Sequence, residues 1–312
     1  MRVSKRPLKH VFGPVPSRRL GFSLGIDLVR PKTCTMDCVY CECGPTTDLT
    51  VTRSCPVDPD AALRELAGVL APGPRVDHVT LSGSGEPTLN ARMDDLIGGI
   101  RALTDVPVAV LTNGSLMTDP AVVAALDLAD VVLPSLDAVS PDAFRRVNRP
   151  HASLDAAAIA RAIAEFSRSA RPQVWLECVF VTGVNDGDYE VDLLAGAAAD
   201  IAPERVHVNT VVRPPAVLDA RPVSAERLAA IAKRLGPRAD VIATPPPSPQ
   251  RHMSRDAESV IVAMATRRPI TAEDVANALG VTRERAEEML AEFSRRNLLT
   301  LVRHDGKLYH RA

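Results

Sequence analysis

Residues 22–43 read FSLGIDLVRPKTCTMDCVYCEC, and this stretch decides the fold. Its first part, residues 22–29, is mostly apolar, which predicts a buried strand. Cys34, Cys38 and Cys41 follow in a Cys-x3-Cys-x2-Cys spacing. Thiolates are the usual iron–sulfur ligands, and short spacings let one loop wrap a cluster. Three cysteines leave one iron of a four-iron cluster open, so the loop predicts a [4Fe–4S] cluster that can bind and activate a ligand.

Four of the six cysteines crowd into residues 34–43. In a reducing compartment, crowded cysteines are more often metal ligands or free thiols than disulfides. The alternative to a cluster is a structural zinc site that uses Cys43 or Cys55 as its fourth ligand. Cys43 makes a strained fourth ligand, because it lies only two residues after Cys41. Cys178 is interpreted as a small buried hydrophobic residue.

Short apolar and β-branched runs recur along the first three quarters of the chain, each followed by a helix-like stretch. Proline after a capping residue marks several helix starts, as at Asp58-Pro59 and Ser140-Pro141. This alternation predicts an α/β fold with a parallel sheet or barrel, and six units are too few for a closed eight-stranded barrel. We therefore expect a partial (β/α)6 barrel with ligands at the carboxyl ends of its strands. The expected strands are residues 22–29, 77–82, 107–112, 130–136, 173–181 and 205–212.

A second motif, Ser82-Gly83-Ser84-Gly85-Glu86-Pro87, follows the second expected strand. Glycines let a ligand approach the backbone closely, and Glu86 can pair with an ammonium group. Alone, the segment is a Gly-rich turn. Beside the cysteine loop, it resembles the radical S-adenosylmethionine (SAM) superfamily. That family has an aromatic residue before the last cysteine, here Tyr40, and a Gly-Gly-Glu-Pro-like motif in which Ser84 replaces the first glycine.

The resemblance covers about residues 11–250 and implies two cofactors, a [4Fe–4S] cluster and SAM. It implies that the open iron chelates the amino and carboxylate groups of SAM, with residues 82–87 and Glu86 holding the amino group. An electron from the cluster then cleaves SAM to methionine and a 5′-deoxyadenosyl radical, which abstracts hydrogen from the substrate. An electron donor such as flavodoxin or ferredoxin is the implied partner.

Further positions match the SAM contacts of related enzymes. Ser135 and Asp137 end the fourth expected strand and are expected at the ribose, and Asn113 at the end of the third strand is expected to reach the same ligand. Val181 and Gly183 resemble the adenine-binding strand end of the family. The alternative for the polar residues in this set is a structural role in a turn or cap.

Three polar residues are candidates for contact with the substrate. Period-two alternation places Glu177 on the same strand face as Val179 and Val181. If that face lines the barrel interior, Glu177 points toward the substrate, and Asn209 and Arg213 on the sixth strand are placed similarly. We take Glu177, Asn209 and Arg213 as candidate catalytic residues, with a paired polar residue at a strand end as the alternative for each.

The segment Gly13-Pro14-Val15-Pro16-Ser17-Arg18-Arg19-Leu20-Gly21, followed by Ser23-Leu24-Gly25, narrows the resemblance. It is similar to radical SAM iron–sulfur oxidoreductases related to wyosine-forming tRNA enzymes. The chain departs from the two-cluster wyosine synthase because it has no second three-cysteine set.

The composition changes at residues 243–254, where a Pro-rich stretch predicts a stiff linker. We expect residues 1–242 to form the barrel and residues 255–312 to form a winged-helix domain of three helices and a hairpin that turns at Asp305-Gly306. The third of these helices mixes arginine with glutamate, which disfavours specific DNA binding. We therefore expect the domain to dock a macromolecular substrate and to do no chemistry itself.

The formal net charge of −1 argues against a globally basic nucleic-acid binder. No apolar run of about 18 residues predicts a membrane span, and no signal peptide is recognisable, so a cytoplasmic protein is expected. The favoured hypothesis is a radical SAM enzyme that acts on RNA, peptide or protein. The alternatives are an iron–sulfur redox sensor that binds DNA, and a radical SAM enzyme that acts on a small molecule.

Overall fold

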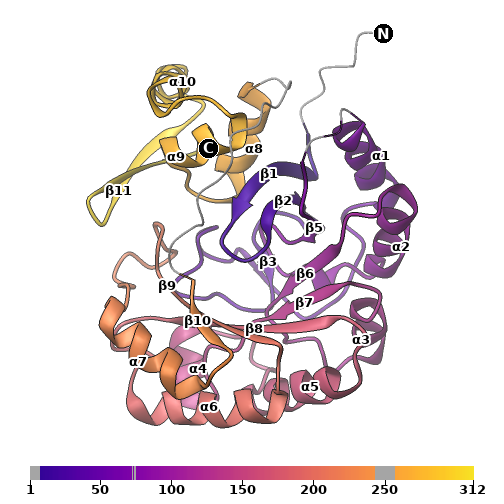
Figure 1. Cartoon of the computed structure of the whole chain (residues 1–312), viewed down its shortest axis with the longest axis vertical. Helices are drawn as coiled ribbons and strands as arrows, with labels where there is room; N and C mark the ends of the chain where they lie inside the picture. Colours follow the sequence, from indigo (N-terminus) through magenta and orange to yellow (C-terminus); the bar gives the residue numbers. More distant parts are fainter. Residues whose placement is uncertain (1–7, 72, 74, 243–256) are drawn as a thin grey trace.

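The computed structural model describes residues 8–71, 73, 75–242 and 257–312 (Figure 1). The Pro-rich segment 243–254, expected to be a linker, therefore lies outside the described residues. Within the described part of the chain, no helix has the length and apolar composition needed to cross a membrane.

One curved sheet runs through the first part of the chain, in the order β1-β2-β5-β6-β7-β8-β9-β10. Every pairing from β2 onward is parallel. All six expected strands are present, the α/β fold class is confirmed, and the strand order is consistent with a partial barrel. The strands of the sheet are β1 (Val11–Ser17), β2 (Gly21–Ile26), β5 (His78–Leu81), β6 (Val108–Thr112), β7 (Val131–Pro134), β8 (Gln173–Phe180), β9 (Arg205–Thr210) and β10 (Ala239–Val241).

Sequence patterns missed the two outermost strands. β1 contains Pro14 and Pro16, and proline is restricted to sheet edges because it cannot donate a ladder hydrogen bond. β1 accordingly pairs with β2 alone, in antiparallel orientation. β10 is only three residues long, too short for a periodic signal. Two further short strands, β3 (Thr33–Cys34) and β4 (Asp48–Leu49), pair with each other.

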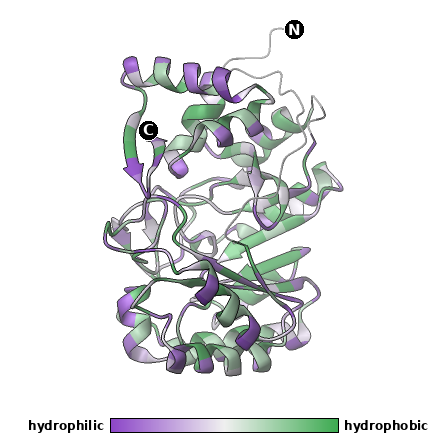
Figure 2. Ribbon diagram, turned by 60° about the vertical axis from the view of Figure 1, so that its left-hand side comes forward, coloured by the Kyte–Doolittle hydropathy of each residue, from purple (hydrophilic) through white to green (hydrophobic). Residues whose placement is uncertain are grey.

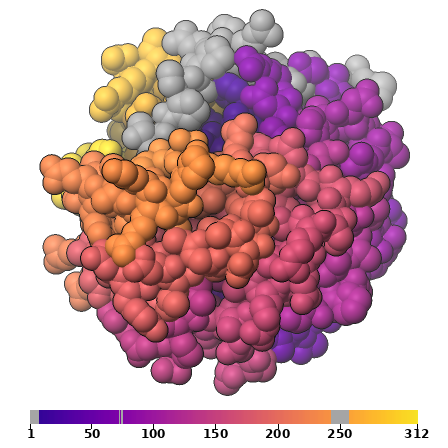
Figure 3. All heavy atoms as spheres, turned by 60° about the horizontal axis from the view of Figure 1, so that its bottom comes forward, coloured from indigo at the N-terminus to yellow at the C-terminus, as the bar shows by residue number. Residues whose placement is uncertain are grey.

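Seven α-helices cover the outside of the sheet (Figure 1), and α5 to α7 form a continuous face in the space-filling view (Figure 3). Several begin as the sequence predicts. The Ser140 hydroxyl accepts from Ala143 N, and proline fills the first position of α1, α3 and α4. The helices are α1 (Pro59–Leu70), α2 (Met93–Leu103), α3 (Pro120–Leu126), α4 (Pro141–Val147), α5 (Ala156–Ser169), α6 (Asp188–Ile201) and α7 (Ala225–Leu235), with a 3-10 turn, η1, at Pro87–Leu89.

The two faces of the sheet pack into different cores. Outward-facing residues such as Val110 and Leu176 join the helices in the main core. A smaller inner cluster forms near the amino ends of the parallel strands, where Leu20 from the β1–β2 turn packs among Ala109, Val131, Leu133 and Trp175. The strands are accordingly among the most hydrophobic parts of the molecule (Figure 2). Polar residues such as Glu177 and Asn209 lie further along β8 and β9 than this inner cluster.

The C-terminal segment, residues 257–312, contains the three helices and the hairpin expected from the sequence. Thr271 and Asp274 form the predicted capping box, and the hairpin turns at Asp305-Gly306, both with positive φ. The assignment of this segment as a winged helix stays a prediction. Its elements are α8 (Ala257–Arg267), α9 (Ala272–Leu279), α10 (Arg283–Arg295), β11 (Thr300–His304) and β12 (Lys307–Arg311).

The C-terminal segment packs directly on the barrel (Figure 1). Val15 of β1 belongs to the same apolar cluster as residues of α8, α9 and α10. Beyond β9, Arg213 forms a buried ion pair with Asp274 at 2.8 Å, and the Tyr309 hydroxyl donates to Val212 O at 2.9 Å. The segment thus contacts the first strand of the sheet as well as residues near its other end.

Candidate cluster and cofactor site

The cysteine loop lies at the carboxyl ends of the parallel strands, after β2, and is held by backbone hydrogen bonds. Asp37 N donates to Asn148 O at 3.0 Å, and Val39 N donates to Val147 O at 2.9 Å. The end of α4 therefore supports the loop, a contact that no sequence motif indicates. The same edge carries the 82–87 loop, because β2 and β5 are neighbours.

Each of the three predicted ligand sulfurs accepts a hydrogen bond from a different nitrogen donor. Asn113 Nδ2 lies 3.6 Å from Cys34 Sγ, and Asn148 Nδ2 lies 3.3 Å from Cys38 Sγ. Lys32 Nζ lies 3.4 Å from Cys41 Sγ. N–H donors aimed at sulfur stabilise a thiolate, and hydrogen bonds of this kind tune iron–sulfur clusters.

In the two nearby cysteines outside this set, the sulfur is the hydrogen-bond donor instead of the acceptor. Cys43 Sγ donates to Arg267 O at 3.0 Å, and Cys55 Sγ donates to Val57 O at 3.4 Å. In these contacts the two thiols are donors, whereas the other three sulfurs are acceptors. These contacts separate Cys43 and Cys55 from the other three.

A single zinc ion is the alternative to a cluster at these cysteines. Zinc–sulfur bonds of about 2.3 Å bring the thiolates of one site to within about 4 Å of each other. Among the described residues, no three Cys, His, Asp or Glu side chains converge in a way that suits one metal ion. Burial raises the pKa of the Cys34 thiol to about 12, so metal binding there displaces a proton.

The 82–87 loop packs tightly against the cysteine loop. A Cβ at Gly85 would lie 1.9 Å from Thr33 O, so only glycine fits this close approach. Glu86 N donates to Thr33 O at 3.2 Å, and Lys32 N donates to Ser84 O at 2.9 Å. The two motifs therefore form one unit of structure.

Glu86 is 2% exposed and receives four hydrogen bonds. Three of them reach Oε1, from the backbone and hydroxyl of Thr88 and from the hydroxyl of Thr112. Oε2 accepts only from Asn113 N, at 2.8 Å, and keeps a lone pair for a further donor. Burial raises the pKa of Glu86. Glu86 thus ties the 82–87 loop to the end of β6 in addition to offering one acceptor.

Asp137 is 3% exposed and connects the cysteine loop to the ends of the strands. The Tyr40 hydroxyl and Asn148 Nδ2 both donate to Oδ2, and Val179 N donates to Oδ1 at 2.8 Å. Burial raises the pKa of Asp137 to about 6. Ser135, the residue after β7, forms a parallel backbone pair with Glu177 of β8. The structure thus gives Tyr40 and Asp137 clear structural contacts, and their contact with SAM stays a prediction.

The turn after β8 holds Val181 and Gly183 in different surroundings. Val181 is buried, and its N–H donates to Asn185 Oδ1 at 2.8 Å. Gly183 is exposed and has φ of 70°, which favours glycine. Asn185, which sequence reasoning missed, also donates to Asp137 O at 2.8 Å and so fixes this turn to the end of β7.

The predicted substrate residues separate into two groups. Glu177 accepts from Asn209 Nδ2 at 2.9 Å, which confirms that both face the same side of the sheet. Arg19 Nη1 donates to Glu177, and Arg18 Nη1 donates to Asn209 Oδ1 at 2.7 Å. Arg213 contacts Asp274 of the C-terminal segment and also Glu42, the residue after Cys41. The two arginines of the β1–β2 turn were visible in the sequence only as part of a Gly- and Pro-rich motif.

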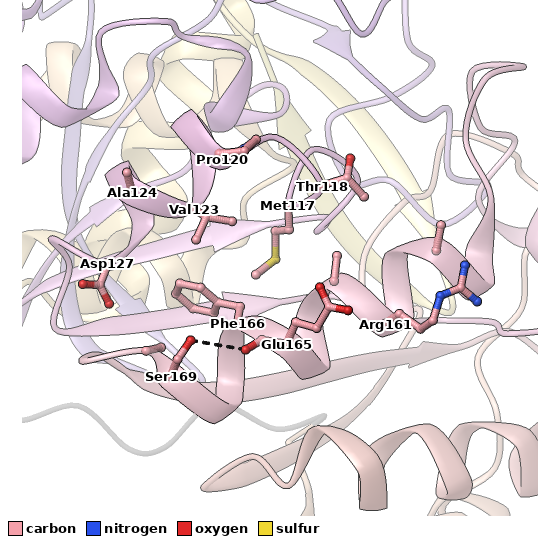
Figure 4. A pocket seen from close by; sticks show the side chains of 13 residues that line it. Met117, Thr118, Pro120, Val123, Ala124, Asp127, Arg161, Glu165, Phe166 and Ser169 are labelled. Atoms are coloured by element: carbon pink, nitrogen blue, oxygen red, sulfur yellow. Dashed lines mark hydrogen bonds between the residues drawn. The ribbon is translucent and has the colours of Figure 1, made fainter.

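A hollow of about 670 Å³ lies elsewhere, between α3 and α5 (Figure 4). Met117, Phe166 and Arg161 are among its lining residues, and none of the predicted site residues lines it. It belongs to the helical outer layer, so it is separate from the strand ends where the motifs meet.

Comparisons with known proteins show which families and folds this chain is similar to. The profile of the Radical SAM superfamily matches residues 28–195. A UPF0026 protein of Helicobacter pylori is 36% identical over 217 residues, which span 68% of this chain and 69% of that protein. A Brachyspira hyodysenteriae protein named GTPase Obg is 37% identical over 210 residues, spanning 67% of this chain and 31% of that protein. A radical SAM methyltransferase structure from Sphaerobacter thermophilus has a TM-score of 0.53 at 18% identity, over 70% of this chain and 65% of that chain, which is a likeness of fold alone.

Proposed function

The chain belongs to the radical SAM superfamily and to the UPF0026 family, and from this premise we propose that Cys34, Cys38 and Cys41 hold a [4Fe–4S] cluster for the reductive cleavage of SAM. The observation that carries the proposal is the direction of the hydrogen bonds at the cysteine sulfurs. The three proposed ligands accept hydrogen bonds from nitrogen donors, whereas Cys43 donates to a carbonyl. When bound, the cluster and SAM supply a 5′-deoxyadenosyl radical that abstracts hydrogen from the substrate.

The chain's own residues bind and orient SAM in this proposal. Glu86 Oε2, with one lone pair unused, accepts from the SAM ammonium group, and Gly85 lets the loop lie against the cysteine loop. Ser135 and Asp137 flank the ribose, and Asn113 supports both the cysteine loop and the 82–87 loop.

The adenine end lies at the β8 turn, where Val181 and Gly183 present the backbone. In this proposal an electron carrier such as flavodoxin or ferredoxin would reduce the cluster. The reaction is of the radical oxidoreductase type, with RNA, peptide or protein as the proposed substrate and the C-terminal segment as the docking surface. The mixed charge of α10, with ion pairs Arg283–Glu287 and Arg285–Glu288, favours a peptide or protein partner over a nucleic acid.

The cysteine assignment is tested with four single variants of the full chain. Protein reconstituted under strict anaerobiosis is expected to hold about four irons, and serine at Cys34, Cys38 or Cys41 to abolish this. Cys43→Ser is the matched control, because it lies in the same loop and is expected to keep the cluster. Loss of the cluster in the Cys43 variant, or stoichiometric zinc in colourless protein, would contradict the assignment.

A further inference from the structure

Two arginines of the β1–β2 turn reach the inward face of the sheet. Arg18 contacts Asn209, and Arg19 contacts Glu177. Their side chains are only 12% and 16% exposed. Arginine is rarely buried without a function or a full set of partners, because removing its charge from water is costly.

This pair lies next to both predicted cofactor regions. Arg18 Nη2 lies 3.6 Å from Oε1 of Glu42, the residue that follows Cys41. Glu177, the partner of Arg19, pairs through its backbone with Ser135, the residue after β7. The arginines are therefore in contact with the cysteine loop on one side and with the strand ends on the other.

The carboxylates around the pair do not match its charge. Arg18 has a neutral amide as its hydrogen-bond partner, and Glu42 is shared with Arg213, whose Nε lies 3.3 Å from Oε2. Asp274 is already held by Arg213 and Arg268. Four guanidinium groups thus face three carboxylates: Arg18, Arg19, Arg213 and Arg268 against Glu42, Glu177 and Asp274.

Hydrogen-bonding capacity is also left over. Arg19 Nε is buried and has no hydrogen-bond partner among the described residues. A buried donor without an acceptor costs free energy. Burial lowers the pKa of Arg18, and Arg19 and Arg213 lower it further against the opposing effect of Glu42 and Glu177.

We propose that Arg18 and Arg19 bind an anionic group of the substrate, a phosphate or a carboxylate, and so position the substrate beside the cysteine loop. The planar guanidinium fork suits both groups, and such charge-assisted contacts are strong when desolvated. The assignment of this ligand as the substrate rests on the proposed function, whereas the binding of an anion does not.

The test uses the full chain, anaerobically reconstituted, titrated calorimetrically with inorganic phosphate or with acetate, against chloride at matched ionic strength. At least one of the two anions is expected to bind the unaltered protein. Arg18→Gln and Arg19→Gln are each expected to weaken that binding at least about tenfold. The tighter of the two anions identifies the chemical class of the group.

Two further variants keep the outcome interpretable. Arg145→Gln, at an exposed arginine of α4, is the matched control and is expected to change the affinity less than about twofold. Arg19→Lys keeps the charge but loses the fork, and is used if the glutamine variant does not fold. Equal anion affinity in the unaltered and Arg18 or Arg19 proteins, or no binding beyond chloride, overturns the proposal. Iron content and SAM cleavage of the same samples show separately whether the proposed function holds.

Discussion

The cysteine loop and the C-terminal segment are attached to the same barrel by different kinds of contact. The cysteine loop is held mainly by backbone hydrogen bonds, such as Val39 N to Val147 O and Glu86 N to Thr33 O. The C-terminal segment is held by an apolar cluster that includes Val15 and by buried arginines. Arg267 of α8 is 8% exposed, and its Nε lies 3.3 Å from Asp27 Oδ2.

These two attachments meet at Asp27. Its Oδ2 accepts from the backbone and hydroxyl of Ser84, in the loop proposed to hold SAM. Arg267 also lies over the Phe12 ring, and its carbonyl accepts from Cys43 Sγ. A segment that the sequence presents as an appendage is therefore connected through one ion pair to the 82–87 loop and through one thiol to the cysteine loop.

Truncation after Gln250 is the change with the largest expected effect on this comparison. It exposes Val15, removes the partner of Asp27 and leaves Arg213 without Asp274. We expect the shortened chain to lose cooperative unfolding and cluster content together, measured by circular dichroism and iron analysis. A shortened chain that keeps its cluster and cleaves SAM would show instead that residues 255–312 serve for docking alone, as the sequence predicts.

Breaking the buried ion pair is the next largest change. Asp274→Asn removes the carboxylate that Arg213 and Arg268 share and leaves Glu42 as the ion-pair partner of Arg213. Breaking a buried pair typically costs about 3–5 kcal/mol in unfolding free energy. Denaturant unfolding measures this, with Asp142→Asn, in an exposed pair with Arg145, as the control expected to change stability by less than about 1 kcal/mol. An equal, small effect at both positions would show that the C-terminal segment is held by its apolar contacts.

The same variant has a pH signature. Burial disfavours the charged form of Asp274, but Arg268 and Arg213 outweigh it and hold the pKa below its ordinary value. A carboxyl with a depressed folded pKa stabilises the protein above its unfolded pKa, about 3.9, and this stability is lost as the pH falls through the folded value. The loss of unfolding free energy below about pH 4 should therefore be smaller in Asp274→Asn than in the unaltered protein.

A substitution at Glu86 tests the 82–87 loop, which lies against the cysteine loop. Glu86→Gln removes the charge that we propose faces the SAM ammonium group, at a cost of about 1.5–3 kcal/mol in SAM binding. Because Glu86 also joins Thr88, Thr112 and Asn113, unfolding must be measured on the same protein. Unchanged SAM affinity with reduced stability would assign Glu86 a structural role only.

Alanine substitutions at two glycines are expected to have the smallest effects on stability, and in opposite directions. Gly85→Ala places a Cβ against Thr33 O, and we expect a loss of about 1–3 kcal/mol. Gly98→Ala, in α2 with nothing within 4 Å, should stabilise by about 0.5–1 kcal/mol. Thermal unfolding of the two variants should shift in opposite directions, and a neutral Gly85→Ala would show that the contact between the two loops is loose.

The sequence predicted the residues whose chemistry or local geometry is distinctive. Cys34, Cys38 and Cys41 were recognisable from their spacing, and the parallel strands from their apolar runs. β1 was not predicted as a strand, because Pro14 and Pro16 are unfavourable in all but an edge strand. The turn at Asp305-Gly306 was predictable because its two positive φ values suit those residues.

Contacts between distant residues left no local signal. Asn148 faces Cys38 from 110 positions away, and Arg18 reaches Asn209 from 191 positions away. The contact of Arg213 with Asp274 was not predictable for the same reason, because Asp274 lies in a segment that was expected to be separate. Pairings of this kind depend on how the barrel closes, which no single stretch of sequence specifies.

The central claim is that the three nitrogen-contacted cysteines support SAM cleavage. Its most direct test is the release of 5′-deoxyadenosine from reduced, reconstituted full-length protein incubated with SAM, measured by liquid chromatography and mass spectrometry. We predict slow release from the unaltered protein and from Cys43→Ser, and none from Cys38→Ser. Protein that holds about four irons per chain yet releases no 5′-deoxyadenosine would contradict the account.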